Sequence, residues 1–135
     1  MIDPLHVPPV DDDELLARFI VNSNEVRADR TVRPQLFLPY SRVELSVNRH
    51  RDASSDETWA VGFQVAEQRG KQLLGRADVL ATACRIPPLE VVPKPHLPHN
   101  PNHADITGFP TSKADQMSLA LQLAAAIEGP WTSPP

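Results

Sequence analysis

The sequence predicts an α+β fold in which a small mixed or antiparallel sheet packs against two main helices. Strict apolar–polar alternation over residues 43–48 is typical of a half-buried strand. Residues 54–70 and 112–128 combine helical spacing of apolar side chains with polar residues suited to begin a helix. A chain of 135 residues buries enough surface for one core without metals or disulfides. We therefore expect a single α+β domain over residues 11–128.

Proline-rich segments flank this domain. Residues 1–10 contain three prolines, and residues 129–135 contain three more. Proline has little conformational entropy to lose on folding, so we predict an N-terminal arm and a C-terminal tail that dock on the body or on a partner. Acidic residues 11–14 precede apolar residues at helical spacing, which predicts a short helix over residues 11–20.

The segment at residues 54–70 carries signals for both helix and strand. Ser54 and Glu57 have the spacing of a capping box, and Gly70 resembles a helix end. Residues 59–65 also alternate as in a strand. We favour the helix, because both of its end signals are present.

The second half of the domain is expected to contain a strand and a long helix. Residues 76–86 are apolar on both phases of the alternation, which indicates a strand covered on both faces, and residues 89–92 are expected to extend it or pair with it. After a proline- and histidine-rich loop, Thr111 or Ser112 begins an apolar helix that runs to about residue 128. Its apolar character on most sides predicts burial.

The composition of the chain indicates in which cellular compartment the protein is expected. Cys84 is the only cysteine, and its apolar neighbours predict a small buried side chain rather than a nucleophile. The N-terminal residues lack the basic start and apolar run of a secretory signal. The longest apolar run near the C-terminus, residues 123–127, is far shorter than the roughly 20 residues of a membrane span. We expect a cytoplasmic protein without a membrane partner.

The loop over residues 93–110 holds five of the 15 prolines and three of the five histidines. Prolines at every third position from residue 95 to 101 match the period of a polyproline II helix. On such a helix His96 and His99 share one edge, about 9 Å apart. This loop is the first place to look for function.

Three residues of this loop are candidate catalytic residues: His99, His103 and Asp105. A turn at residues 100–102 would bring them together, and for a metal site His96 is expected to be excluded, because it lies on the extended segment before that turn. The same three side chains suit a metal, but no CxxC or HExxH spacing supports a ligand set. We predict no metal and no cofactor, and keep acid–base chemistry as the alternative to a structural loop.

The start of the last helix is a candidate anion-binding site. Backbone N–H groups at a helix start, together with the side chains of Thr111, Ser112 and Lys113, suit a phosphate or carboxylate. The segment lacks the GxxxxGK[ST] spacing of a nucleotide-binding loop. Ordinary helix capping explains the same residues.

Arginines cluster in the first half of the chain. Residues 18–51 contain seven arginines and three acidic residues, a local charge of +4 in a chain of net charge −4. Such asymmetry suits nucleic acid or an acidic partner, although Phe37 and Tyr40 offer little base stacking. The candidate nucleic-acid-binding residues are Arg27, Arg30, Arg33, Arg42, Arg49 and Arg51.

These features support three hypotheses about function. The first is a non-catalytic protein that associates with a protein partner or with itself, because the chain has proline-rich arms, segregated charge and no assembled catalytic set. The second is a small enzyme acting on a phosphorylated or nucleic-acid substrate through the histidine loop and the adjoining helix start. The third is a nucleic-acid-binding module that uses the arginines of residues 18–51.

Overall fold

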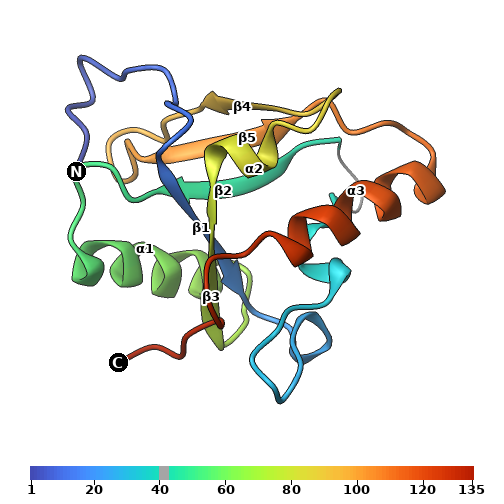
Figure 1. The fold of residues 1–135 in the computed structure, drawn as a ribbon. Coiled ribbons are helices and arrows are strands. Elements are labelled where there is room, and N and C mark those ends of the chain that lie inside the picture. The colour runs from blue at the N-terminus through green and yellow to red at the C-terminus, as the bar shows by residue number, and fades with distance from the viewer. Residues whose placement is uncertain (40–42) are drawn as a thin grey trace.

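The structure is a computed structural model that describes residues 1–39 and 43–135, with an antiparallel sheet at its centre (Figure 1). The strands are β1 Leu15–Ile20, β2 Leu45–Arg49, β3 Gly75–Leu80, β4 Glu90–Pro93 and β5 His103–Thr107. The helices are α1 Ser55–Gln68, α2 Ala81–Cys84 and α3 Lys113–Ala125, with 3-10 helices η1 Ser23–Glu25 and η2 Pro34–Phe37. The strand order is β3-β1-β2-β5-β4, and every pair is antiparallel. The predicted α+β class is confirmed.

One face of the sheet carries the main hydrophobic core. Leu16 and Ile20 of β1 point to this face and are fully buried. Leu123 of α3 and Phe37 of η2 belong to the same cluster of buried side chains. Successive residues of a strand point to opposite faces, so the neighbouring Phe19 points away from this core.

Helix α1 covers part of the opposite face. Its Trp59 forms a smaller cluster with Val21 and Leu73, and Phe19 of β1 packs against that cluster. The approach is close at Gly62, where a Cβ atom would lie 2.7 Å from Cε1 of Phe19. Helices α1 and α3 therefore pack on opposite faces of the sheet, as the two main helices of the predicted fold (Figure 1).

Both main helices begin at predicted caps. The Oγ of Ser54 accepts a hydrogen bond from the N–H of Glu57, and the Glu57 carboxylate accepts one from the N–H of Ser54, so the predicted capping box is confirmed. Ser112 begins α3 by accepting a hydrogen bond from the N–H of Asp115. Within the described ranges, no helix is both long and apolar enough to cross a membrane.

Cys84 occupies a buried position at the end of α2. Burial raises the pKa of its thiol to about 12, despite the neighbouring charge of Arg85. The thiolate, which is the reactive form, is therefore scarce at neutral pH. The prediction of a small buried side chain is confirmed.

The helix predicted over residues 11–20 is wrong, because its second half is strand β1. This strand lies inside the sheet, between β3 and β2. Arg18 concealed the strand pattern, because it is buried in β1 and its Nε and Nη1 donate to the carbonyl oxygens of Leu36 and Ser46, both at 2.9 Å. A charged residue among the buried positions breaks the apolar period of two, and the remaining apolar residues show helical spacing.

The other strand predictions are correct to different degrees. The strand predicted over residues 43–48 is confirmed as β2, which begins two residues later and ends one residue later. The strand predicted over residues 76–86 is only partly correct, because β3 ends at Leu80 and the next four residues form α2. Residues 89–92 neither extend nor pair with β3. They lie mostly in β4, at the opposite edge of the sheet, which pairs with β5.

The predicted loop over residues 93–110 is wrong at its centre, where β5 pairs with both β2 and β4. Ala104 and Ile106 belong to the main core. His103 and Asp105 alternate with them and therefore point to the opposite face. This five-residue alternation is typical of a strand, but the surrounding prolines and histidines concealed it.

The chain segments at both ends contact the body of the protein. Ile2 is buried, and its N–H donates to Oδ1 of Asn102 at 2.9 Å. The amide of Asn102 in turn donates to the carbonyl oxygens of Arg49 and Arg51, each at 2.8 Å. Near the C-terminus, Thr132 exchanges two backbone hydrogen bonds of 3.0 Å with Arg76, on the outer edge of β3. Both segments are thus attached to the sheet.

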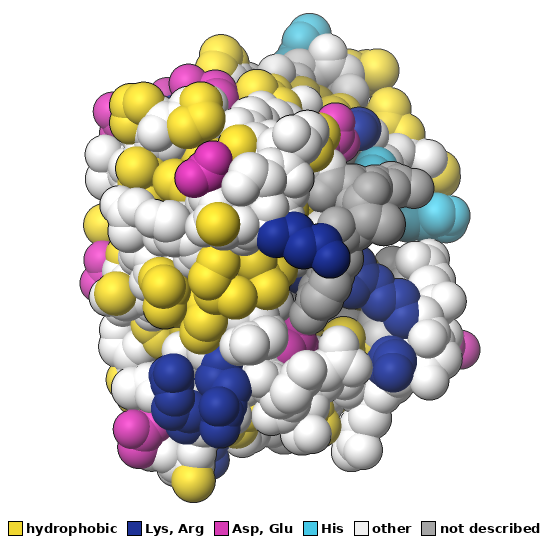
Figure 2. Space-filling model, turned by 90° about the vertical axis from the view of Figure 1, so that its right-hand side faces the viewer, with side chains coloured by type: hydrophobic (Ala, Val, Ile, Leu, Met, Phe, Trp, Pro, Cys, Tyr) yellow, Lys and Arg dark blue, Asp and Glu magenta, His cyan; other side chains and the backbone are white. Residues whose placement is uncertain are grey.

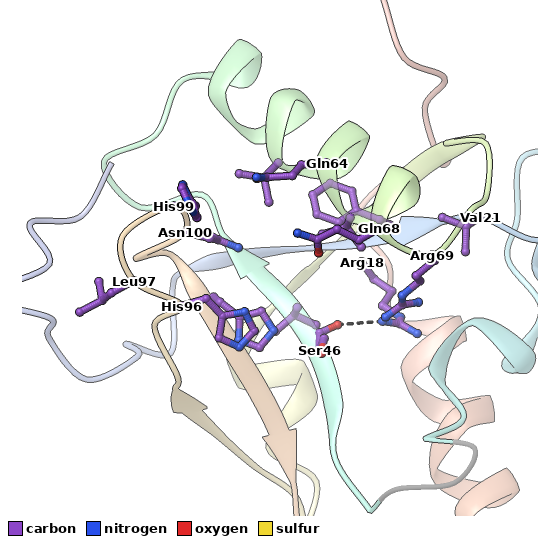
Figure 3. A pocket seen from close by; sticks show the side chains of 15 residues that line it. Arg18, Val21, Ser46, Gln64, Gln68, Arg69, His96, Leu97, His99 and Asn100 are labelled. Atoms are coloured by element: carbon purple, nitrogen blue, oxygen red, sulfur yellow. Dashed lines mark hydrogen bonds between the residues drawn. The ribbon is translucent and has the colours of Figure 1, made fainter.

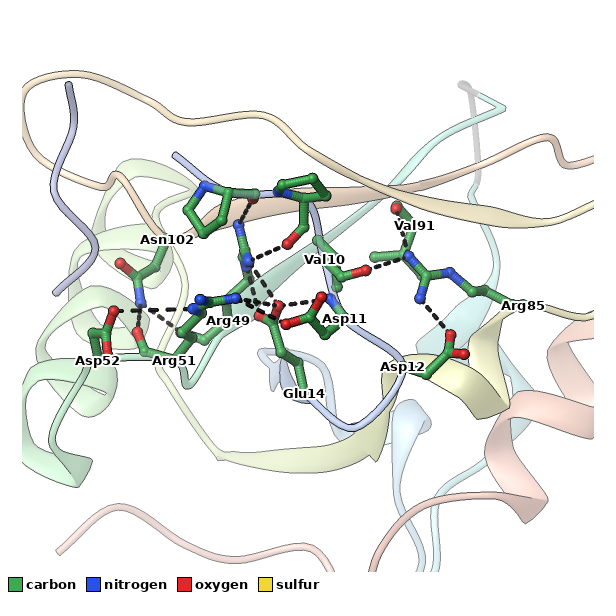
Figure 4. A network of polar contacts seen from close by, with 12 residues as sticks. Val10, Asp11, Asp12, Glu14, Arg49, Arg51, Asp52, Arg85, Val91 and Asn102 are labelled. Atoms are coloured by element: carbon green, nitrogen blue, oxygen red, sulfur yellow. Dashed lines mark hydrogen bonds and ion pairs between the residues drawn. The ribbon is translucent and has the colours of Figure 1, made fainter. Parts of the chain in front are cut away.

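A buried ion pair joins the N-terminal segment to the sheet (Figure 4). Arg49, at the end of β2, is fully buried, and its Nε and Nη2 each donate to the carboxylate of Glu14 at 2.7 Å. Its Nη1 and Nη2 also donate to the carbonyl oxygens of Pro8 and Pro9, at 2.8 and 3.0 Å. Burial alone would raise the pKa of Glu14, but the hydrogen bonds from Arg49 and from the N–H of Asp11 outweigh it and lower that pKa.

Removing one partner of this pair should strongly destabilise the fold. We expect Arg49→Met to lower the free energy of unfolding by roughly 3–5 kcal/mol, because it leaves the buried Glu14 carboxylate with only the N–H of Asp11 and a longer contact to the half-exposed Arg51. Urea denaturation measures this change. The matched control is Arg51→Met, since Arg51 pairs with the same carboxylate at 3.4 Å but is 34% exposed, and it should cost less than about 1 kcal/mol. Equal losses for the two variants would contradict the importance of the buried pair.

Candidate functional site

A cavity of about 220 Å³ lies beside α1, between that helix and the sheet (Figure 3). Helix α1 and its end supply one wall, β1 and β2 supply the floor, and the turn before β5 closes one end. The lining combines apolar, amide and charged side chains. It consists of Arg18, Phe19, Val21, Ser46, Val47, Val61, Gln64, Val65, Gln68, Arg69, His96, Leu97, His99, Asn100 and His103.

The chain reverses direction just before β5 and brings the histidines to the cavity. The N–H of His96 donates to the carbonyl of Asn100 at 2.8 Å, and the N–H of Asn100 donates back to the carbonyl of His96 at 2.7 Å. The predicted polyproline II edge is therefore wrong, because residues 97–99 form a turn. A second turn at residues 101–102 leads into β5, in the region where the sequence predicts one.

His96 and His103 stack on each other at this end of the cavity. Their ring centroids are 3.8 Å apart, and the rings are 18° from parallel. His96, which the sequence places on an extended segment away from the other histidines, therefore lies beside His103. This position follows from the turn, because a chain that doubles back at residues 97–99 places residues before and after it side by side (Figure 3).

The hydrogen-bond partner of His103 assigns its tautomer. Nδ1 lies 2.9 Å from the carbonyl oxygen of Lys94. A carbonyl can only accept, so Nδ1 carries the proton and Nε2 of the neutral ring carries the lone pair. Oδ1 of Asp105 lies 3.8 Å from Nε2, which is too far for a hydrogen bond. The buried imidazole therefore presents a proton acceptor.

Burial favours the neutral form of His103. Only 9% of its side chain is exposed, and desolvation lowers its pKa, with a further contribution from the neighbouring charge of His96. The Lys94 carbonyl and Asp105 act in the opposite direction. Asp105 itself lies 3.2 Å from Nζ of Lys94, which also lies 3.1 Å from Glu44.

The wall around this histidine pair contains unusual buried polar groups. Nδ2 of Asn100 donates to Oδ1 of Asn48 at 2.7 Å. In the described part of the chain, the buried Nδ2 of Asn48 and Oδ1 of Asn100 have no protein hydrogen-bond partner. Each such group costs stability of about 1–3 kcal/mol. Buried polar groups without partners are rare in native structures and call for an explanation, of which a functional role is one.

Two arginines give the cavity positive charge. Arg18 is buried and held by the carbonyl oxygens of Leu36 and Ser46. Arg69 follows α1 and its side chain is exposed, with no ion-pair or hydrogen-bond partner for the guanidinium among the described residues. Gln64 and Gln68 lie one helical turn apart on the face of α1 that borders the cavity. The cavity therefore has an imidazole end and a guanidinium–amide wall.

The structure brings together only some of the predicted catalytic and anion-binding residues. His99 and His103 line the same cavity, and the buried Asp105 lies beside His103. The candidate anion-binding residues Thr111, Ser112 and Lys113 are exposed and lie beyond the other end of β5. A strand of this length spans about 13 Å, so the helix start does not reach the histidines. The described residues contain no group of three or more side chains placed to hold a metal ion.

The predicted arginine surface divides into separate parts. Arg49 is fully buried by Glu14, and Arg51 pairs with Asp11 and Glu14 in the same cluster (Figure 4). Arg49 is therefore not available to a phosphate group. Arg27, Arg30 and Arg33 are exposed on the loop before η2, whereas Arg42 and Tyr40 lie outside the described residues.

Sequence reasoning missed the residues that α1 contributes to the cavity. The spacing of Gln64 and Gln68 indicates one helix face, but nothing in the sequence shows that this face borders the histidines. The comparisons with known proteins add no assignment. No protein-family model matches the chain, and neither a curated protein nor a solved structure has significant similarity to it.

The lowered pKa of His103 predicts a pH dependence of stability. The folded protein resists protonation of this ring, so the unfolded chain takes up the proton first as the pH falls. The free energy of unfolding should therefore decrease as the pH falls from about 7 through the usual histidine pKa of about 6.5. Denaturation curves at several pH values measure this decrease. The His103→Gln variant should show a smaller decrease over the same range, and identical slopes would contradict the assignment.

Proposed function

We propose that the protein binds a small anion with an apolar body in this cavity, and that His103 acts on it as a general base. The observation that carries the proposal is the fixed tautomer of His103, whose Nδ1 proton is held by Lys94 and whose Nε2 is left as the acceptor. A neutral, partly buried imidazole at a cavity wall is suited to accept a proton near neutral pH. The reaction class is proton abstraction from a bound small molecule.

The size and walls of the cavity favour a small ligand. Its volume of about 220 Å³ exceeds the roughly 150 Å³ that is enough for a benzene ring in an apolar protein cavity. Phe19, Val61 and Val65 supply apolar walls, while Gln64 and Gln68 supply amide groups. A few polar groups that converge on an otherwise apolar pocket are typical of small-molecule sites.

The charge of the lining favours an anion. The guanidinium of Arg69 is exposed and has no acidic partner in the described segments, so a carboxylate or phosphate can pair with it without displacing an existing contact. This supports the enzyme hypothesis in a changed form, with α1 rather than the start of α3 as the anion-binding element. A cytoplasmic location remains part of the proposal.

The first test measures binding of aromatic anions. Phenyl phosphate and benzoate should shift the amide resonances of cavity residues in NMR titrations, while the neutral benzyl alcohol should bind at least tenfold more weakly. Arg69→Gln should weaken binding of phenyl phosphate at least tenfold, because it removes a charge-assisted contact worth about 1.5–3 kcal/mol. Lys71→Gln is the matched control, an exposed cation two residues further on that does not line the cavity. Equal effects of the two variants would count against the site.

The second test measures the proton directly. An anion bound beside His103 favours the protonated ring, so binding of benzoate near pH 6.5 should be accompanied by proton uptake. Calorimetric titrations in buffers of different ionisation enthalpy report the number of protons taken up. His103→Gln should still bind benzoate but lose this uptake. Unchanged proton uptake in the variant would show that another group titrates, and would reject His103 as the base.

A further inference from the structure

The outer face of α3 carries apolar side chains that the protein itself does not cover. Leu119, Ala120 and Leu123 are buried, so the burial predicted for this helix is correct for one side. Leu121 lies on the other side and is 53% exposed. Met117 and Ala125 stand one turn before and after it and continue the stripe.

This stripe borders a groove on the side of the molecule away from the histidine cavity. The groove has a volume of about 660 Å³ and runs between the C-terminal half of α3 and the loop that precedes η2. Leu121, Ala124 and Ile127 line it from the helix side, and Val32 and Pro34 line it from the loop side. Figure 2 shows hydrophobic side chains gathered on this face, with basic side chains next to them.

Two arginines of the groove are held in place by neutral groups. The Nη1 of Arg27 donates to the carbonyl oxygen of Val32 at 2.8 Å. The guanidinium of Arg30 lies over the ring of Trp131, 4.2 Å from its centroid, and donates to Oγ of Ser133 at 3.0 Å. These contacts fix the guanidinium planes without neutralising their charge, so little side-chain entropy is left to lose on binding.

Neither arginine forms an ion pair with an acidic side chain in the described part of the chain. Among the described residues, no carboxylate lies within 4.0 Å of Arg27 or Arg30. Asp29 borders the same groove, and its carboxylate accepts hydrogen bonds from the N–H and Oγ1 of Thr31. These bonds and, to a smaller extent, the charge of Arg27 lower the pKa of Asp29, although the two side chains form no ion pair. Elsewhere, the guanidinium groups of Arg49, Arg51, Arg76 and Arg85 each lie within 4.0 Å of a carboxylate. Arg27 and Arg30 thus place guanidinium groups without an ion pair beside an apolar groove.

We propose that this groove docks an amphipathic segment of a partner protein that carries acidic residues beside apolar ones. Apolar side chains of that segment fill the groove against Leu121 and Ala124, and its carboxylates pair with Arg27 and Arg30. This is the helix-in-groove mode of peptide recognition, in which apolar anchors give affinity and charge gives orientation. The surface is distinct from the cavity and does not depend on its proposed function.

The shape of the surface favours a peptide over the other anionic partners. Nucleic acid would use the charge of the arginines but would leave the apolar groove without a partner. A membrane surface is flat, whereas these apolar side chains line a groove between a helix and a loop. A second copy of this chain would need an acidic apolar segment of its own, and residues 11–14 are tied to the sheet through Glu14.

Selection from a displayed library of random 16-residue peptides tests the proposal with the full-length protein. The selected peptides should be enriched in both acidic and large apolar residues. In fluorescence anisotropy, a selected peptide should bind at least tenfold more weakly to Leu121→Asp and at least threefold more weakly to Arg30→Gln. Its affinity should fall as salt rises from 50 to 500 mM, because the arginine contacts are exposed.

Matched variants outside the groove serve as controls for this test. Leu5→Asp changes a leucine that is 83% exposed, and Lys71→Gln changes an exposed lysine, and neither residue lines the groove or the histidine cavity. Both should bind the peptide as the unaltered protein does, and circular dichroism should show all variants folded. Selected peptides without acidic enrichment, or binding that survives Leu121→Asp, would overturn the proposal. The proposal would also be overturned if the protein sedimented with phosphatidylserine vesicles, or formed a dimer by light scattering, and Leu121→Asp abolished that association.

Discussion

The buried pair of Arg49 and Glu14 is the constraint on which the arrangement of the chain depends. The guanidinium of Arg49 binds the carboxylate of Glu14, which precedes β1, and the carbonyl groups of Pro8 and Pro9. Beside it, Asn102 joins the backbone at the end of β2 to Ile2 and to the turn that leads into β5. Three segments far apart in the sequence therefore meet at one desolvated charge, which is tolerated only because every contact around it is present. Because Asn102 lies in the turn at residues 101–102, the same junction also holds the turn that leads into β5.

The sheet separates two surfaces of different chemistry. On the side of α1, buried imidazole and amide groups surround a small cavity. On the side of α3, apolar side chains and exposed arginines border an open groove. The separation follows from strand geometry, because alternate residues of β1 and β5 serve opposite faces. A ligand in the cavity and a segment in the groove do not compete for space, so the two proposals are independent.

Local sequence signals predicted where the main helices begin. The strands depend on pairing between segments that are far apart in the sequence, which is harder to predict. Ser54 and Ser112 mark helix starts through contacts three residues away, and such contacts are visible in a sequence. β1 was missed because a buried arginine interrupts its apolar pattern, and β5 because its partners β2 and β4 lie elsewhere in the chain. The high proportion of histidines in residues 93–110 led to the prediction of His103 as a site residue. The turn that brings His96 beside it could not be predicted from the sequence. The contribution of Arg69 depends on the packing of Gly62 on Phe19, which fixes the rotation of α1.

The attachment of Thr132 to β3 also matters for the colloidal behaviour of the protein. β3 is an edge strand, and the uncovered edge of a sheet is a template on which another chain can add a strand. The backbone pair between Thr132 and Arg76 occupies part of that edge, and Gly75 admits the contact because a Cβ there would collide with the carbonyl oxygen of Thr132. At the other edge, Arg85 donates to the carbonyl oxygens of Val91 and Val10. Clipping of the tail by a protease would therefore promote edge-to-edge aggregation while leaving the cavity intact.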